Sequence, residues 1–153
     1  MHVWTEASLI QVLIQAEAGS CERNTYNEVT LEYLETRRVA RPYPYPYGFV
    51  IGTRAADGDG VDCYLITTHR LKAGTIVTCE PVGLLAQTEG EELDHKVLAA
   101  LPGEDVVLGE ALLQGLQDFI HALFEAYPGA SVRVGPILPR EAALHHLQQS
   151  RPA

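Results

Sequence analysis

Up to about residue 101, the chain consists of short apolar runs, each ended by glycine, proline or acidic residues. Residues 8–16 alternate apolar and polar side chains, the pattern of a strand with one buried face. Further strands are expected at 29–33, 49–53, 61–68, 75–79, 82–86 and 97–101. Short strands separated by such turns favour a small closed β-barrel, because closure pairs every strand edge.

The last third of the chain has a helical period. Apolar residues between 108 and 127 recur at spacings of three and four, which indicates one amphipathic helix. Pro128 and Gly129 are expected to end this helix, and 131–135 to form an edge strand. Pro139 then suits the start of a short final helix. The sequence therefore predicts an α+β fold, a small OB-like closed β-barrel with helices packed on it, in a single domain over 1–153.

Composition restricts the possible partners. The 20 acidic and 11 basic residues give a net charge of −9, which disfavours nucleic acids and anionic membranes as partners. The apolar runs are far shorter than the roughly 18–20 residues of a membrane span. Residues 1–6 lack the basic start and apolar core of a secretory signal, and three widely spaced cysteines suggest reduced thiols. We expect a soluble, cytoplasmic protein.

The first candidate site is the acidic segment 57–62, with the sequence DGDGVD. At about 4–6 Å separation, its three carboxylates repel one another by several kcal/mol at an intermediate dielectric, so bringing them together requires cations. Carboxylate oxygens on a glycine-containing loop suit Mg²⁺, Mn²⁺ or Ca²⁺. A solvated acidic turn is the alternative. An EF-hand does not fit, because Asp62 stands where that motif needs glycine.

A second acidic segment contains Glu89, Glu91, Glu92 and Asp94 and is followed by Lys96. Alone, such a cluster reads as a solvated hairpin tip. Two acidic turns at the ends of consecutive strands can however converge in space. Lys96 would then point into the same cavity and could contact a phosphate.

Residues 42–48 alternate proline with tyrosine before a glycine. Each proline removes a backbone donor and holds the preceding residue in an extended conformation, which excludes a helix. We expect a stiff loop that fixes the directions of its three tyrosines.

These segments together resemble family I soluble inorganic pyrophosphatases. The acidic segment 57–62 resembles the family signature D-x-D-P-x-D, and 43–49 resembles the preceding Y-P-x-N-Y-G-Y/F. Residues 79–85 are similar to R-P-V-G-V-L, and 89–97 to D-(x)4-D-x-K-V/I. Residues 123–127 match the F-F-x-x-Y end of the long helix. The motifs occur in the family order over most of the chain.

The resemblance implies hydrolysis of pyrophosphate to two phosphates by a metal-activated water, with Mg²⁺, or alternatively Mn²⁺, as the cofactor. It assigns Asp57, Asp62, Glu89 and Asp94 as metal ligands. Asp59 is expected to orient the attacking water or to accept its proton. A water between two cations loses its proton near neutral pH because its pKa falls by several units.

The same resemblance implies a set of phosphate contacts. Lys96 and Tyr47 are expected to stabilise the charge that develops during the reaction. The expected substrate-binding residues are Tyr43, Tyr47, Lys96, Tyr127 and Arg38.

Two lysine positions of the family fall on Thr25 and Pro128 in strict register, so other cations are needed. The family arginine upstream of the tyrosine loop also has no counterpart in strict register, and the candidates to replace it are Arg37, Arg38, Arg41 and Arg54. Two further functions stay open: a relative that cleaves another phosphoanhydride, and a catalytically weak protein that binds metal or phosphate. The resemblance also implies a homo-oligomer, commonly a hexamer in bacterial relatives.

Overall fold

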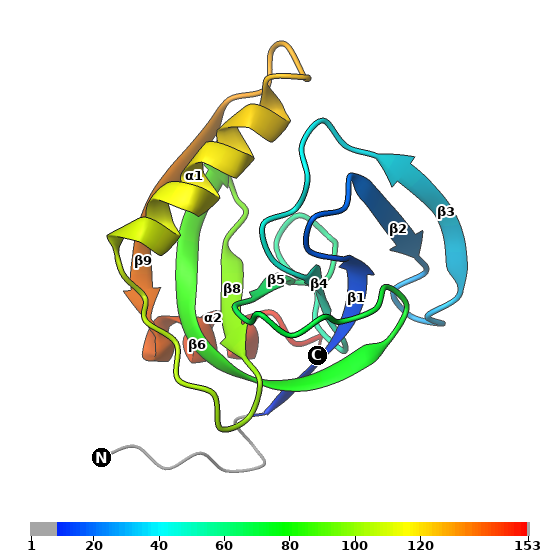
Figure 1. Ribbon diagram of the computed structural model, residues 1–153, viewed down its shortest axis with the longest axis vertical. Coiled ribbons are helices and arrows are strands. Elements are labelled where there is room, and N and C mark those ends of the chain that lie inside the picture. Colours follow the sequence, from blue (N-terminus) through cyan, green and yellow to red (C-terminus); the bar gives the residue numbers. More distant parts are fainter. Residues whose placement is uncertain (1–8, 153) are drawn as a thin grey trace.

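The computed structural model describes residues 9–152, and its strands close into the expected barrel (Figure 1). The ring consists, in spatial order, of β1 (Ile10–Ala16), β4 (Tyr47–Val50), β5 (Asp62–Leu65), β8 (Lys96–Ala100) and β6 (Ile76–Glu89). Strand β6 then pairs with β1 and completes the circle. The predicted α+β class with a closed, barrel-like sheet is confirmed, and closure pairs the edges of these five strands.

Strand β6 makes this closure possible because it is 14 residues long. It pairs with β1 through 76–79, with β8 through 80–85 and with β9 (Val132–Pro139) through 83–89. The segments expected as strands at 75–79 and 82–86 are therefore parts of one continuous strand. The register shifts directly after Pro81, between it and Gly83, and such an irregularity is where a sheet tolerates the missing N–H of proline.

A two-stranded hairpin, β2 (Glu22–Tyr26) and β3 (Tyr33–Arg38), lies beside the barrel. The expected strand at 29–33 was wrong, because most of these residues form the hairpin turn. The Asn27 side chain accepts the N–H groups of Val29 and Thr30, each at 2.9 Å. Leu31 has a positive φ of 65°, which no strand residue adopts. The Asn27 side chain thus pairs with backbone N–H groups that would otherwise bond to a neighbouring strand, and the chain turns.

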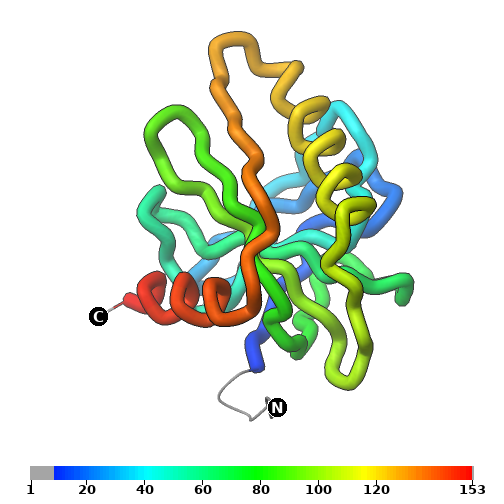
Figure 2. The backbone as a smooth tube through the Cα atoms, turned by 90° about the vertical axis from the view of Figure 1, so that its left-hand side faces the viewer, coloured from blue at the N-terminus to red at the C-terminus, as the bar shows by residue number. Residues whose placement is uncertain are grey.

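In the described part of the chain, two helices pack on the barrel. Helix α1 (Glu110–Phe124) confirms the predicted amphipathic helix and buries four side chains: Leu112, Leu116, Phe119 and Ile120. It ends at Phe124, before the expected end at Pro128 and Gly129, so Tyr127 lies outside it. Helix α2 (Arg140–Gln149) begins directly after Pro139, as expected. Figure 2 shows β9 running from the loop after α1 to α2. The edge strand expected at 131–135 is β9, which extends to Pro139, and the short β7 (Glu92–Leu93) forms a tight hairpin with β6.

The core has two buried clusters. One lies between the barrel and α2 and includes Val12, Leu65 and Leu147. The other lies between the barrel and α1 and contains Tyr43, Tyr47 and Tyr64 among aliphatic side chains. The predicted tyrosine loop is therefore packed on one side by helix α1, which holds its rings in place.

The remaining expectations concern the cysteines, the secretory signal and membrane-spanning segments. Cys63 and Cys79 are buried, Cys21 is partly exposed, and all three are free thiols. The expected absence of a secretory signal concerns residues 1–6, which lie outside the described residues. Within 9–152, no helix is both long and apolar enough to cross a membrane.

Gly48 offers a test of the barrel. A Cβ there would lie 1.9 Å from the Leu13 carbonyl oxygen of the neighbouring strand, so alanine must push β1 and β4 apart. We expect Gly48→Ala to lower the free energy of unfolding by about 3 kcal/mol or more. Urea denaturation followed by circular dichroism measures this.

Gly115 is the matched control, because it is exposed on α1 and its Cβ would meet nothing within 4 Å. Gly115→Ala is expected to raise stability by up to about 1 kcal/mol. A Gly48→Ala protein as stable as the wild type would contradict the close approach of the two strands.

Candidate active site

The two acidic segments converge on one cavity of about 240 Å³, which confirms that expectation. The convergence follows from the sheet. Asp62 begins β5 and Asp94 lies just before β8, and these two strands pair in parallel with Cys63 opposite Val97. The starts of the two strands therefore lie side by side. The acidic residues that line the cavity are Asp57, Asp59, Asp62, Glu89 and Asp94.

Lys96 connects the carboxylates of the two strands. Its Nζ donates to Asp62 Oδ2 at 2.5 Å and to Asp94 Oδ1 at 3.1 Å, and the residue is only 6% exposed. Burial alone would lower the pKa of Lys96, but Tyr47, Asp62 and Asp94 offset this and leave it well above the ordinary value. Lys96 is thus a buried ammonium ion inside the cavity, as predicted.

The carboxylates fit a divalent cation by their chemistry. Within residues 9–152, no three acidic, histidine or cysteine side chains already form a ready ligand set. Asp62 and Asp94 are nevertheless close enough to share one positive charge, that of Lys96. Burial raises the pKa of Asp94 despite Lys96, as expected for a carboxylate that needs more compensating charge. Hard oxygen donors around such a position suit Mg²⁺ or Mn²⁺.

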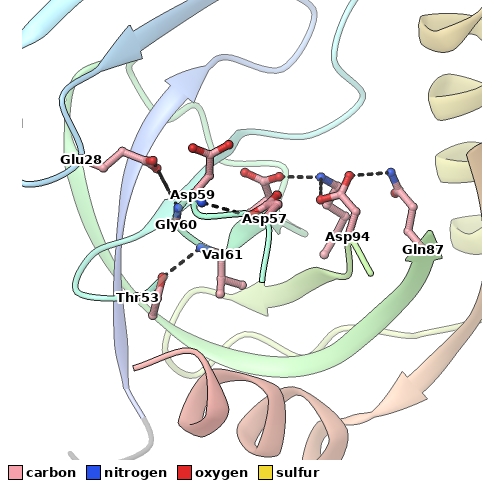
Figure 3. Close-up of polar contacts among 10 residues, drawn as sticks. Glu28, Thr53, Asp57, Asp59, Gly60, Val61, Gln87 and Asp94 are labelled. Atoms are coloured by element: carbon pink, nitrogen blue, oxygen red, sulfur yellow. Dashed lines mark hydrogen bonds and ion pairs between the residues drawn. The ribbon is translucent and has the colours of Figure 1, made fainter. Parts of the chain in front are cut away.

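The acidic loop is attached to the hairpin through Gly60. The Gly60 nitrogen lies 3.2 Å from both carboxylate oxygens of Glu28, to which its N–H donates. Figure 3 shows this contact between the loop and the hairpin. The family signature has proline at this position, which has no N–H to donate. A Cβ on Gly60 would also lie 2.8 Å from Glu28 Oε2 and 3.2 Å from the Phe49 ring. Burial raises the pKa of Glu28 in this contact.

A second cavity, of about 290 Å³, lies between the hairpin and the acidic loop. It shares Arg23, Asp59 and Asp62 with the first cavity, and it is also lined by Arg37. Arg23 and Arg37 are register partners on β2 and β3, so they come from adjacent positions of the hairpin. Both cavities therefore meet at Arg23, which places a cation opposite the acidic loop.

Arg23 is the functional candidate that sequence reasoning missed. Its guanidinium carbon lies 5.4 Å from the centre of the Tyr47 ring, and its Nε is buried without a hydrogen-bond partner among the described residues. Tyr47 raises the pKa of Arg23, against the opposing effect of burial. The two-residue repeat of a strand could have revealed it, because residues two apart point to the same face. Arg23 and Thr25 are two residues apart, and both line this cavity. The positive charge that the family has at position 25 is thus present at Arg23, on the same face of strand β2.

Tyr43 and Tyr47 form an aromatic wall behind these cations. Their ring centres are 5.1 Å apart, and Tyr47 also packs on Tyr64 at 5.0 Å. Burial raises the pKa values of Tyr43 and Tyr47, so both phenols are neutral. The Lys96 Nζ lies 6.0 Å from the centre of the Tyr47 ring. Both tyrosines are therefore next to the candidate phosphate-binding cations, although their substrate contacts remain predictions.

Of the predicted substrate-binding residues, Lys96 lines a cavity, whereas Tyr127 and Arg38, like Tyr43 and Tyr47, are not among the residues that line either one. Tyr127 follows α1, is 59% exposed and packs its ring against Phe124 at 6.4 Å. Arg38 is exposed and lies 3.8 Å from the carboxylate of Glu22. Adjacent strand residues point to opposite faces, so the hairpin directs Arg37, and not Arg38, toward the acidic loop.

Known proteins are similar to this chain in sequence and in fold. The family model described as inorganic pyrophosphatase matches residues 17–148. The inorganic pyrophosphatase of Nanoarchaeum equitans is 29% identical over 93% of this chain and 95% of its own length. That of Synechocystis sp. is 34% identical, over 65% of this chain and 60% of its own. The solved inorganic pyrophosphatase structure from Thermus thermophilus superimposes with a TM-score of 0.84, at 27% identity, over 98% of this chain and 94% of that one. This chain belongs to the inorganic pyrophosphatase family of hydrolases.

Proposed function

We propose that the protein hydrolyses inorganic pyrophosphate to two phosphates, with Mg²⁺, or alternatively Mn²⁺, as the activating cation. One observation carries the proposal: the acidic residues of two turns face three basic side chains across adjoining cavities. The basic residues are Arg23, Arg37 and Lys96. A polyanion can enter so acidic a site only with cations, and its phosphate oxygens then need fixed positive groups.

Four carboxylates are suited to hold the cations: Asp57, Asp62, Glu89 and Asp94. When bound, Mg²⁺ supplies positive charge that lowers the pKa of a water molecule and screens the phosphate oxygens. Asp59 is exposed and lines both cavities, so it can orient the attacking water or accept its proton. The water oxygen bonds to one phosphorus, the bridging P–O bond breaks, and the bridging oxygen leaves with the electron pair on the second phosphate.

Lys96 has two alternative sets of partners in this scheme. Without substrate it neutralises Asp62 and Asp94. When cations neutralise these carboxylates, its ammonium group is available to the phosphate oxygens. Lys96 and Arg23 then stabilise the negative charge that accumulates as the anhydride breaks.

Arg23 also argues for an active enzyme over a catalytically weak binding protein. The weak alternative rested on missing family cations, and Arg23 and Arg37 place positive charge in the cavity. Cleavage of another phosphoanhydride is tested by the same assay with other substrates. A single domain, a cytoplasmic location and a homo-oligomer, hexameric by family resemblance, belong to this proposal.

Asp62→Asn tests the metal-assisted reaction. Removing one ligand charge should lower kcat/KM for pyrophosphate by about 100-fold or more, because a bound cation contributes several kcal/mol. Phosphate release is measured with and without millimolar Mg²⁺, and circular dichroism verifies the fold. Asp118→Asn, on the exposed face of α1, is the control and should leave the rate unchanged. A folded wild-type protein that releases no phosphate above background would overturn the proposed function.

Arg23→Met tests the phosphate contact. Charged hydrogen bonds contribute about 1.5–3 kcal/mol, so kcat/KM should fall by about 10- to 100-fold, while Arg23→Lys retains part of the activity. Arg38→Met is the matched control, because that side chain lies outside both cavities and its rate should stay near wild type. If Arg38→Met were the damaging change and Arg23→Met harmless, the assignment of Arg23 would be wrong.

A further inference from the structure

Gln87 is a polar residue in the buried part of β6, at only 2% exposure, and it lines the acidic cavity. Its side-chain Nε2 donates to Asp94 Oδ2 at 3.4 Å, as Figure 3 shows. Its Oε1 is buried and has no hydrogen-bond partner among residues 9–152. An apolar side chain of similar length would fill this position without leaving an acceptor unpaired, so stability alone does not favour glutamine here.

The backbone of Gln87 is tied to the same segment. The Asp94 N–H donates to the Gln87 carbonyl oxygen at 2.9 Å, and the Gln87 N–H donates to His95 Nδ1 at 3.0 Å. The register between β6 and β9 shifts between Leu85 and Gln87, which is a β-bulge or similar irregularity. Such irregularities redirect a side chain beside an active site. The local backbone thus directs the Gln87 amide to Asp94.

The two oxygens of Asp94 have different partners. Oδ1 accepts from Lys96 and Oδ2 accepts from Gln87. Lys96 is the partner that changes when a cation and a phosphate enter, whereas Gln87 carries no charge and does not compete for phosphate. Gln87 can therefore keep the carboxylate oriented through the exchange.

We propose that Gln87 is a positioning residue that holds Asp94 in the orientation in which it binds the activating cation. The inference rests on the proposed function, because it assumes that Asp94 is a ligand. Residues that orient metal ligands typically contribute 10- to 100-fold to metal affinity. The unpaired Oε1 is then the cost in stability of a residue kept for its contact with Asp94.

Gln87→Met separates this role from a structural one. We expect the dissociation constants of Mg²⁺ and Mn²⁺, measured by calorimetry without substrate, to rise about 10-fold. The melting temperature of the metal-free protein should stay equal or rise, because the buried amide is removed. In the activity assay, the half-saturating Mg²⁺ concentration should rise about 10-fold, with kcat at saturating Mg²⁺ largely retained.

Gln114→Met is the matched control, since Gln114 makes the same type of bond to Asp118, at 2.8 Å, on the exposed face of α1. It should change neither the cation affinity nor the Mg²⁺ dependence. Gln87→Asn, one methylene too short to reach Asp94, provides a second test if the methionine variant does not fold, and it should lose cation affinity as well.

The outcomes separate the two proposals. If the wild type binds Mg²⁺ and both folded Gln87 variants bind it equally well, the role of Gln87 is wrong and the proposed function stands. A wild type that binds neither cation overturns the metal site, and with it the role of Gln87.

Discussion

The parallel pairing of β5 with β8 is the constraint on which the site depends. It places the first residue of one strand, Asp62, beside the segment that enters the other, Asp94, and Lys96 joins the two. The strands occupy this position because the long β6 closes the barrel around them. Like charges are thus brought together by backbone hydrogen bonds whose geometry does not depend on the charges themselves. The fold thus brings together carboxylates that need a positive charge nearby, and Lys96 provides one.

Much of this arrangement could be predicted from the sequence. Period-2 runs and a period-3.6 stripe were sufficient for a barrel with helices, and both acidic turns and Lys96 could be placed in one cavity. The errors have local physical causes. The segments 75–79 and 82–86 form one strand because a shift of register beside Pro81 accommodates the proline. The residues after Asn27 turn because its side chain bonds to the backbone. Neither effect is visible in the pattern of apolar residues.

The basic residues of the site were harder to predict. A phosphate contact requires only that a positive charge reach a given position, and residues at different places in the sequence can supply it. Matching residues one by one put a neutral threonine at the expected lysine position, whereas the guanidinium of Arg23 reaches the same cavity from two residues earlier. Arg37 was one of several candidates, and the strand pairing selects it by placing it opposite Arg23. Carboxylates that would share one cation must lie within a few ångströms of one another, so their positions in the sequence can shift less. Their spacing is therefore easier to recognise in the sequence.

The hydrogen bond between Gly60 and Glu28 joins the segment that carries the carboxylates to the hairpin that carries the arginines. The bond therefore couples the position of the acidic loop to that of the hairpin. Two sites coupled in this way influence each other equally in both directions. Under the proposed function, cation binding at the acidic loop and anion binding beside the hairpin would be linked in part through the Gly60 N–H, a bond that a proline at this position could not make.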